Sequence, residues 1–412
     1  MTEPLDVAII GGGAAGIAAA RLLMAHRRTV KVIEALPRLG GRAFTRPIQG
    51  LPLDMGCGWL HSAERNPLAA LATEAGREID RHESAWSKQL GNIGFPAEAQ
   101  RDAWAAFEAF KDRLRTHPPD SDRAADALPR TDRWRAFADG LSSFMNGTEL
   151  DTLSAADFLA YEDAASENNW RLPGGYGAFI ADLGRSVPAS LSTRVEAVIC
   201  DGHITLETNR GSLHATAVII AVSTEILARG DIRFSPALDD HLQAAHRLPL
   251  GLANKVFLSL ADPEALPPES HLLGTTDRAA TGSYYLRPFG RPIIECFLGG
   301  SFARDLERQG PEAATAFAIE ELQSLLGGDF ARGLSPLTVT EWGKAPTIGG
   351  SYSHALPGHS AARATLASPP SPRLCFAGEA CSAHDFSTAH GAWQSGRAAA
   401  THIESFLSGR EG

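Results

Sequence analysis

The 412-residue chain lacks the features of several protein classes. Its five cysteines include no CxxC pair, so we expect reduced thiols, with neither a disulfide framework nor a metal site. No apolar run approaches the roughly 18 residues of a membrane span. The apolar stretch near the N-terminus follows no basic region and is interrupted by glycines, unlike a signal peptide. Lysine and arginine form no run, which argues against a nucleic-acid partner. These absences predict a cytoplasmic protein without a membrane or nucleic-acid partner, and nothing in the sequence indicates an oligomeric state.

The composition is that of a folded protein with more than one core. Hydrophobic residues make up 44% of the chain and charged residues 21%, both near the globular average. A chain of 412 residues exceeds the usual size of a single core, so we expect two domains, or one domain with a large insertion. The 48 acidic against 38 basic residues would favour cationic small molecules as partners.

The first chemical motif lies between a predicted strand and a predicted helix. Residues 5–10 are typical of a buried parallel strand, 16–25 of a helix and 29–33 of a second strand. The segment between the first strand and the helix matches G-x-G-x-x-G, whose glycines allow a tight turn, close approach to a pyrophosphate and helix–strand packing. Glu34 ends the second strand, where a carboxylate can accept hydrogen bonds from ribose hydroxyls. The pattern predicts a βαβ unit that binds a dinucleotide at the helix N-terminus. Its contacts would come from Gly11, Gly13, Ala14, Ala15, Gly16 and Glu34.

The rest of the chain divides into a helical segment and strand-rich segments. Residues 65–165 are rich in Ala, Glu, Asp and Arg, which predicts a helical insertion. Four residues in it recur at helical spacing and predict a packed core face: Trp104, Phe107, Phe110 and Leu114. The dipeptide Asp201-Gly202 indicates a hairpin turn. Strands are predicted within 193–222 and at 254–260, 293–298 and 373–377, and helices at 311–326 and 391–406.

The second motif continues from Glu34. Gly40-Gly41 lets the chain pass close to a ligand, and Arg42 supplies a cation that can bind a phosphate in a bidentate manner. An acidic strand end followed by Gly-Gly-Arg resembles the flavin-binding half of the FAD-dependent amine oxidase family, which includes monoamine oxidases, polyamine oxidases and lysine-specific histone demethylases. The resemblance implies an FAD cofactor, with contacts here from Glu34, Ala35, Gly41 and Arg42.

A third motif occupies residues 54–61, which read DMGCGWLH. It resembles the family's D-x-G-x-x-W-(I/L)-H segment, most closely in the polyamine oxidase branch. The resemblance implies that Gly58 and Trp59 lie near the flavin and that His61 and Trp59 line the substrate path. Ser62 replaces the glycine that usually follows the histidine.

A lysine opens the predicted strand at 254–260. Taken alone, a lysine at a strand start is usually a solvated surface charge. The surrounding Gly-Leu-Ala-Asn-Lys-Val, however, resembles the family's G-x-x-N-K-V segment. The resemblance implies that Lys255 holds a water that bridges to flavin N5 and influences the reaction of the reduced flavin with oxygen.

A fifth motif ends in Gly350-Ser351-Tyr352-Ser353. It resembles the family segment whose tyrosine forms one wall of an aromatic cage before the flavin, and the electron-rich ring of Tyr352 would align an amine there. Relatives with covalently bound flavin carry a cysteine where this chain has Ser351. The resemblance therefore implies non-covalent FAD.

The C-terminal part contains Phe-Ala-Gly378-Glu379 and, further on, Thr388-Ala389-His-Gly-Ala. Both resemble family motifs, with matching spacing. The resemblance implies that Gly378 and Glu379 contact the ribityl or pyrophosphate part of FAD and that Thr388 and Ala389 reach the isoalloxazine. Thr388, which stands where monoamine oxidases have a second cage aromatic, would also face the substrate, and Val195 would contact the adenine.

Together these motifs predict an α/β (α+β) fold with a Rossmann-like FAD-binding domain and a discontinuous substrate domain of mixed sheet plus a helical insertion. The FAD-binding domain would comprise 1–70, 171–235 and 370–412. The insertion would comprise 71–170, and the rest of the substrate-binding domain 236–369.

The predicted activity is oxidation of a primary or secondary amine to an imine by hydride transfer to flavin N5, with O2 reoxidising the flavin to give H2O2 and with hydrolysis to an aldehyde. Catalytic roles fall on Lys255, Tyr352 and His61, and substrate contacts on His61, Trp59, Tyr352 and Thr388. His61 and the acidic balance favour a di- or polyamine. The alternatives are an L-amino acid oxidase, which would need a cation such as Arg65 or Arg287 for the carboxylate, and a desaturase- or isomerase-like flavoprotein of the same fold. A flavin-binding protein without catalysis is a further alternative.

Overall fold

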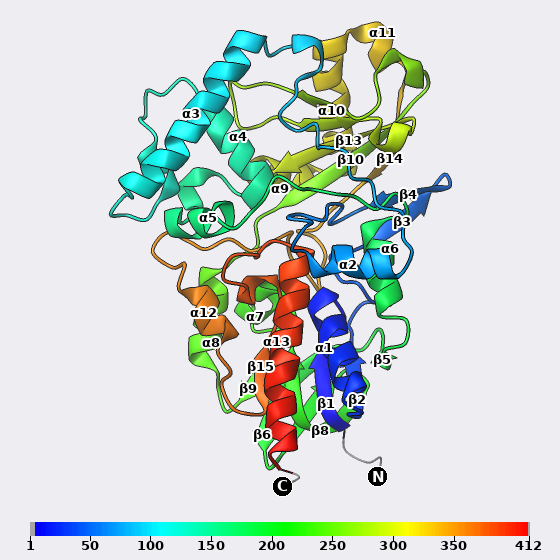
Figure 1. Cartoon of the computed structure of the whole chain (residues 1–412), viewed down its shortest axis with the longest axis vertical. Helices are drawn as coiled ribbons and strands as arrows, with labels where there is room; N and C mark the ends of the chain where they lie inside the picture. The colour runs from blue at the N-terminus through cyan, green and yellow to red at the C-terminus, as the bar shows by residue number, and fades with distance from the viewer. Residues whose placement is uncertain (1–4, 411–412) are drawn as a thin grey trace.

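The computed structural model describes residues 5–410 and divides into two lobes, each built around its own sheet (Figure 1). Residues 1–4 and 411–412, at the ends of the predicted FAD-binding domain, lie outside the described residues. No described helix is both long enough and apolar enough to cross a membrane.

The larger sheet contains the predicted βαβ unit. Its strands lie in the order β5-β2-β1-β8-β7-β6-β9, with β15 also paired to β8. Strand β1 runs parallel to both β2 and β8, as expected for a doubly wound sheet. The hairpin predicted at Asp201-Gly202 joins β6 to β7. The bounds are β1 (Leu5–Ile10), β2 (Val30–Ile33), β5 (Ala189–Ser190), β6 (Val195–Asp201), β7 (His203–Thr208), β8 (Gly211–Ile220), β9 (Arg233–Ser235) and β15 (Leu374–Phe376).

Helices cover both faces of this sheet, which explains the continuous apolar run of β1. Side chains alternate along the strand, so Val7 and Ile9 join the core beneath α1 (Ala14–Ala25) and α13 (Ala389–Ser408). Ala8 and Ile10 join the opposite core, which also receives α7 (Thr224–Ala228), α8 (Asp239–Arg247) and α12 (Ala362–Ala367). Helices α8 and α12 lie within the 236–369 stretch predicted as substrate-binding, yet their buried side chains belong to the core of the larger sheet.

The second lobe is built on an antiparallel sheet in the order β11-β12-β13-β10-β14. The strands predicted at 254–260 and 293–298 are its two central neighbours β10 and β13, and the helix predicted at 311–326 is α10. The strands are β10 (Ala253–Leu260), β11 (Ser270–Leu273), β12 (Ser283–Leu286), β13 (Ile293–Gly299) and β14 (Leu334–Val339). The helices beside them are α9 (Gly300–Gln309), α10 (Pro311–Leu326) and α11 (Gly328–Ala331).

The helical character predicted for residues 65–165 is confirmed. The segment contains α2 (Pro67–Glu74), α3 (Ala97–Thr116), α4 (Arg135–Asn146) and α5 (Ala155–Glu162), and α3 to α5 lie beside the second sheet (Figure 1). Phe107, Phe110 and Leu114 of α3 are buried in one core, as predicted, whereas Trp104 packs only partly against it. The hairpin β3 (Thr45–Ile48) and β4 (Leu51–Asp54) and helix α6 (Tyr176–Leu183) lie between the two lobes.

Candidate active site

One large cavity of about 1290 Å³ is lined by residues from both lobes. This volume exceeds that of a pocket for a drug-sized ligand, so it has room for a dinucleotide and a second molecule. All of the residues predicted for the site line it except Gly16. From distant parts of the sequence it collects Gly11, Gly13, Ala14, Ala15, Glu34, Ala35, Gly41, Arg42, Gly58, Trp59, His61, Val195, Lys255, Tyr352, Gly378, Glu379, Thr388 and Ala389.

The glycine motif has the geometry of a phosphate cradle. Gly11 has a φ of 103°, and a Cβ there would lie 2.5 Å from the backbone oxygen of Ala221, so only glycine fits. At Gly13 a Cβ would meet nothing nearer than 4.0 Å and would project into space that the cavity needs. No side chain caps α1, so its first N–H groups are free to bind an anion. Gly16 serves packing instead, because a Cβ there would lie 2.0 Å from the oxygen of Gly11.

The carboxylate of Glu34 is held rigidly at the end of β2. One oxygen accepts from the Gly12 N–H at 2.6 Å and the other from the Leu36 N–H at 2.7 Å. Burial raises the pKa of Glu34, while these two N–H groups oppose the rise. Each oxygen keeps a lone pair for a further donor, such as a ribose hydroxyl.

Arg42 and Glu379 form an ion pair in the wall of the cavity. The NH1 group of Arg42 donates to Glu379 at 2.9 Å and to the Ser351 backbone oxygen at 2.6 Å, which leaves the rest of the guanidinium available for a phosphate. Glu379 is 5% exposed. Burial alone would raise the pKa of Glu379, but Arg42 and Arg363 bring it below the ordinary value.

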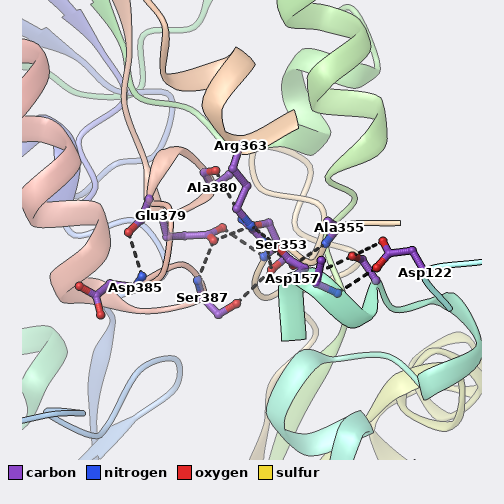
Figure 2. A network of polar contacts seen from close by, with 12 residues as sticks. Asp122, Asp157, Ser353, Ala355, Arg363, Glu379, Ala380, Asp385 and Ser387 are labelled. Carbon is purple, nitrogen blue, oxygen red and sulfur yellow. Dashed lines mark hydrogen bonds and ion pairs between the residues drawn. The ribbon is translucent and has the colours of Figure 1, made fainter. Parts of the chain in front are cut away.

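A buried network continues from Glu379 into the helical segment (Figure 2). The Glu379 carboxylate accepts from the Ser353 hydroxyl at 2.6 Å and from the Ser387 N–H at 2.9 Å. Arg363 donates to the Ser353 hydroxyl at 2.9 Å and binds both oxygens of Asp157, on α5, at 2.6 and 2.8 Å. Because Ser353 follows Tyr352 and Ser387 precedes Thr388, this network links α5 to two of the predicted site residues.

Lys255 projects from β10 into the cavity. Its Nζ lies 2.9 Å from the Asp54 backbone oxygen and 2.7 Å from a carboxylate oxygen of Glu295 on β13. A Cβ on Gly58 would lie 3.6 Å from the same Nζ, so the lysine reaches the predicted flavin-facing loop. The lysine is 4% exposed and is not a solvated surface charge.

The surroundings of His61 favour the neutral form of its imidazole. Its Nδ1 lies 2.8 Å from the side-chain oxygen of Asn169 and therefore donates, which leaves Nε2 as an acceptor. Burial lowers the pKa of His61 to about 4. The indole of Trp86 lies 6.0 Å from the imidazole and 4.4 Å from the ring of Trp59, so the predicted substrate path has aromatic walls.

Tyr352 is held by a hydrogen bond from its hydroxyl to the backbone oxygen of Phe144 on α4. The Tyr352 side chain lines the cavity. Burial raises the pKa of its hydroxyl, which favours the neutral phenol. The neighbouring Ser351 hydroxyl lies 2.8 Å from both the N–H and the oxygen of Ala253. Among the described lining residues the only cysteine is Cys57, and burial raises the pKa of its thiol to about 12.

Thr388 is the N-cap of α13, whose first turn lines the cavity. Its hydroxyl accepts from the Gly391 N–H at 2.9 Å and caps α13. The positive end of the α13 dipole therefore points toward the wall formed by Thr388 and Ala389.

The two arginines considered as carboxylate ligands do not line the cavity. Arg65 binds both oxygens of Asp385, at 2.6 and 2.8 Å. Arg287 donates to the Leu266 backbone oxygen at 2.7 Å and pairs with Glu264.

Three residues at the site were not found from the sequence: Glu295, Arg363 and Asp157. Glu295 had a usable signal, because it is the one charged residue in the otherwise apolar Ile293–Gly299 strand. Arg363 and Asp157 are 3% and 1% exposed, but they lie in segments whose composition gives no sign of burial.

The family described as "Flavin containing amine oxidoreductase" matches residues 14–88 and 83–404 of the chain. Polyamine oxidase 2 of Arabidopsis thaliana is 27% identical, over 97% of this chain and 88% of that protein. Polyamine oxidase 5 of Oryza sativa subsp. japonica is 28% identical, over 98% of this chain and 89% of that protein. Lysine-specific histone demethylase 1 homolog 1 of Oryza sativa subsp. japonica is 28% identical, over 97% of this chain and 52% of that longer protein.

Solved structures share the fold. A redesigned putrescine oxidase superposes with a TM-score of 0.80 at 19% identity, covering 98% of this chain and 99% of that one. Cyclohexylamine oxidase from Brevibacterium oxydans superposes with a TM-score of 0.77 at 22% identity, covering 98% and 100%. The likeness confirms the predicted α/β architecture with a Rossmann-like cofactor domain.

Proposed function

The chain belongs to the flavin-containing amine oxidoreductase family and is a flavoenzyme that uses FAD, and from this premise we propose its reaction. It oxidises a primary or secondary amine to an imine, and O2 accepts the electrons to give H2O2. The observation that carries this proposal is that Lys255, Tyr352 and His61, from three separate segments, all line the cavity that contains the phosphate cradle.

The residues present fit the cofactor. The free N–H groups of α1 and the guanidinium of Arg42 would bind the pyrophosphate, Glu34 the ribose, Val195 the adenine, and Gly378 and Glu379 the ribityl chain. Gly58, Trp59, Thr388 and Ala389 would surround the isoalloxazine. Bound FAD supplies the acceptor for the hydride that leaves the amine α-carbon.

The protein's own part is to bind and orient a neutral amine. The ring of Tyr352 and the aromatic walls at Trp59 exclude water and align the nitrogen. The Nε2 acceptor of His61 takes a hydrogen bond from the amine, and Lys255 presents an N–H group on the flavin side. No strong base is needed, because a neutral amine carries the electron pair that expels hydride.

We propose that FAD is bound without a covalent bond, because Ser351 replaces the linking cysteine and Cys57 has a thiol of raised pKa. The division into FAD-binding segments (1–70, 171–235 and 370–412) and substrate-binding segments (71–170 and 236–369) is likewise proposed. The packing of α8 and α12 against the larger sheet supports counting these two helices with the FAD-binding segments. A cytoplasmic location stays a prediction.

An L-amino acid oxidase is less well supported. Arg65 and Arg287 are both committed to other partners and lie outside the cavity lining. A desaturase- or isomerase-like reaction has no evident use for a lysine held beside Gly58.

A peroxide-coupled assay in air tests the proposal. Purified enzyme is mixed with primary amines, secondary amines, diamines and amino acids, and H2O2 and aldehyde are both measured. We expect equal amounts of the two products from at least one amine and none from amino acids. Turnover of amino acids alone would replace the proposal with the amino acid oxidase.

A further inference from the structure

One wall of the cavity is an apolar stripe on α4. Phe137, Leu141 and Phe144 follow one another at helical spacing of four and three residues, and all three line the cavity. Phe144 lies seven positions along the helix from Phe137, so the stripe is about 10 Å long.

The stripe begins at the reaction site. The backbone oxygen of Phe144 accepts the hydrogen bond from Tyr352, and its ring lies 6.5 Å from that of Phe297. Phe297 is paired with Lys255 across the β10–β13 ladder, and the lysine Nζ lies 5.9 Å from its ring centre. An amine at Tyr352 would therefore have its substituent directed along α4.

The stripe ends in a second aromatic group. The ring of Phe137 lies 5.4 Å from Trp104 on α3 and 5.8 Å from Phe95. Phe95, Trp104, Phe107 and Leu273 all line the cavity. The aromatic repeat of α3 thus packs the core with Phe107, Phe110 and Leu114, and Trp104 and the edge of that core at Phe107 line the cavity.

Two exposed apolar side chains also belong to this cavity. Trp86, at 37%, and Met145, at 38%, are the large hydrophobic residues that stand exposed in the described part of the chain, and both line it. Isolated exposed apolar residues need no explanation, but two on the lining of one cavity indicate a path for an apolar molecule.

Three carboxylates of the cavity lining lie beside a lysine, and two of them, Glu108 and Glu162, share Lys111. Glu295 pairs with Lys255 at 2.7 Å, and Glu108 and Glu162 lie 2.7 and 3.5 Å from the Nζ of Lys111. The stripe itself offers no acceptor to a second ammonium group, and desolvating an unpaired charge is costly.

We propose that the substrate is a monoamine with an apolar chain of roughly eight carbons, and that this chain lies along Phe137, Leu141 and Phe144. This inference rests on the proposed amine oxidation. It selects among amines, since the names of the relatives point to polyamines whereas this wall favours an uncharged chain.

A length series tests the proposal with the FAD-loaded enzyme. For straight primary amines from propyl to decyl, we expect kcat/KM to rise about threefold per methylene, as burial of each group predicts, and to level off near octyl. The α,ω-diamine of each length should be at least about a hundredfold poorer, because its second charge enters the stripe. Diamines that match or exceed the monoamine of equal length would overturn the proposal.

Measuring the binding of amines that cannot be oxidised tests the proposed chain-binding site independently of the proposed oxidation. Amines with a fully substituted α-carbon have no hydrogen to transfer, so their affinity can be measured by calorimetry even if no amine is oxidised. Affinity that rises with chain length would support binding along the apolar stripe even if no amine is oxidised. Affinity that is independent of chain length would contradict binding along the apolar stripe.

Variants locate the effect. Leu141→Ala should flatten the length dependence beyond butyl, and Leu141→Asp should lower octylamine kcat/KM by about thirtyfold or more while improving diamines. Glu162→Gln tests the competing site at Lys111. If the parent enzyme oxidises diamines efficiently and Glu162→Gln abolishes that turnover, the Glu162 carboxylate recognises the substrate and the apolar wall does not.

Discussion

The Nζ of Lys255 lies 2.7 Å from the Oε1 of Glu295. A second acceptor, the backbone oxygen of Asp54, lies 2.9 Å away. An ammonium group has three donors, so these two contacts direct the remaining N–H toward the cavity. Glu295 thus acts on the orientation of the lysine and not on the substrate directly.

Lys255→Met should slow the reaction of the reduced enzyme with O2 by roughly a hundredfold, the lower end of what a positioned proton-transfer group contributes, and Glu295→Gln by only roughly tenfold, because Glu295 acts through the lysine. Stopped-flow absorbance after mixing reduced enzyme with oxygen measures both. FAD content after gel filtration should stay unchanged, and Glu320→Gln on the exposed face of α10 is the matched control. Parental reoxidation rates in both cavity variants would contradict the assigned role of the pair.

The buried pair of Arg363 and Asp157 should matter for stability and for cofactor retention. Asp157→Asn leaves a buried guanidinium without its carboxylate, which costs about 3–5 kcal/mol, and it releases Ser353 and Glu379. We expect a lower Tm and faster loss of FAD on dilution, followed by fluorescence of the free flavin.

The surface pair Arg308–Asp305, with side chains 77% and 54% exposed, provides the comparison. Arg308→Ala should change stability by less than about 1 kcal/mol. Equal effects of the two substitutions would show that the network in Figure 2 does not hold the cofactor site together.

Acid should destabilise the protein through its buried histidines. Burial lowers the pKa of His271 and of His61 to about 4 and that of His354 to about 3. An unfolded histidine has a pKa of about 6.5. At a pH between the native and the unfolded pKa values, these histidines are protonated in the unfolded chain and neutral in the native chain. The free energy of unfolding should therefore fall as pH drops from about 6.5 to 4, by about 1.4 kcal/mol per pH unit for each residue.

His271→Gln keeps a polar group near Ser283 and removes one of these protons. Urea titrations at pH 7 and pH 5 should show a smaller loss for this variant than for the parent. His203→Gln, at an exposed position on β7, serves as the control. A pH dependence that does not change in His271→Gln would contradict the account of the buried imidazole.

Acid or heat precipitation should release all of the FAD into the supernatant, because Ser351 offers no thiol and its hydroxyl is engaged by Ala253. Absorbance of the supernatant and of the resolubilised pellet measures the division. Yellow colour that stays with the precipitated chain would show a covalent link.

Local patterns explain what the sequence could predict. The βαβ unit at Gly11 and Glu34 is specified within one short segment, so its strands and turn were recognisable. Lys255 and Tyr352 were found through family motifs, since a strand lysine alone suggests a surface position. Glu295 reaches the lysine only because β10 and β13 pair in a particular register, and no local signal encodes that register.

In the helical segment 65–165, too, the local sequence does not encode the tertiary contacts. The repeat of Trp104 and Phe107 predicted a core face, and the helix forms as expected. Spacing cannot tell which of the aromatic rings pack in the core and which close a cavity, because that depends on how α4 crosses α3. Asp157 and Arg363 likewise lie far apart in the sequence and meet only in the folded chain.

Anaerobic reduction of the bound flavin tests amine oxidation without interference from oxygen. Purified enzyme is mixed without oxygen with octylamine, a diamine and an amino acid, and the visible absorbance of the bound flavin is followed. We expect that an amine bleaches the flavin and that admitting oxygen restores the colour. A yellow protein that no amine bleaches would keep the fold and the cofactor but contradict amine oxidation.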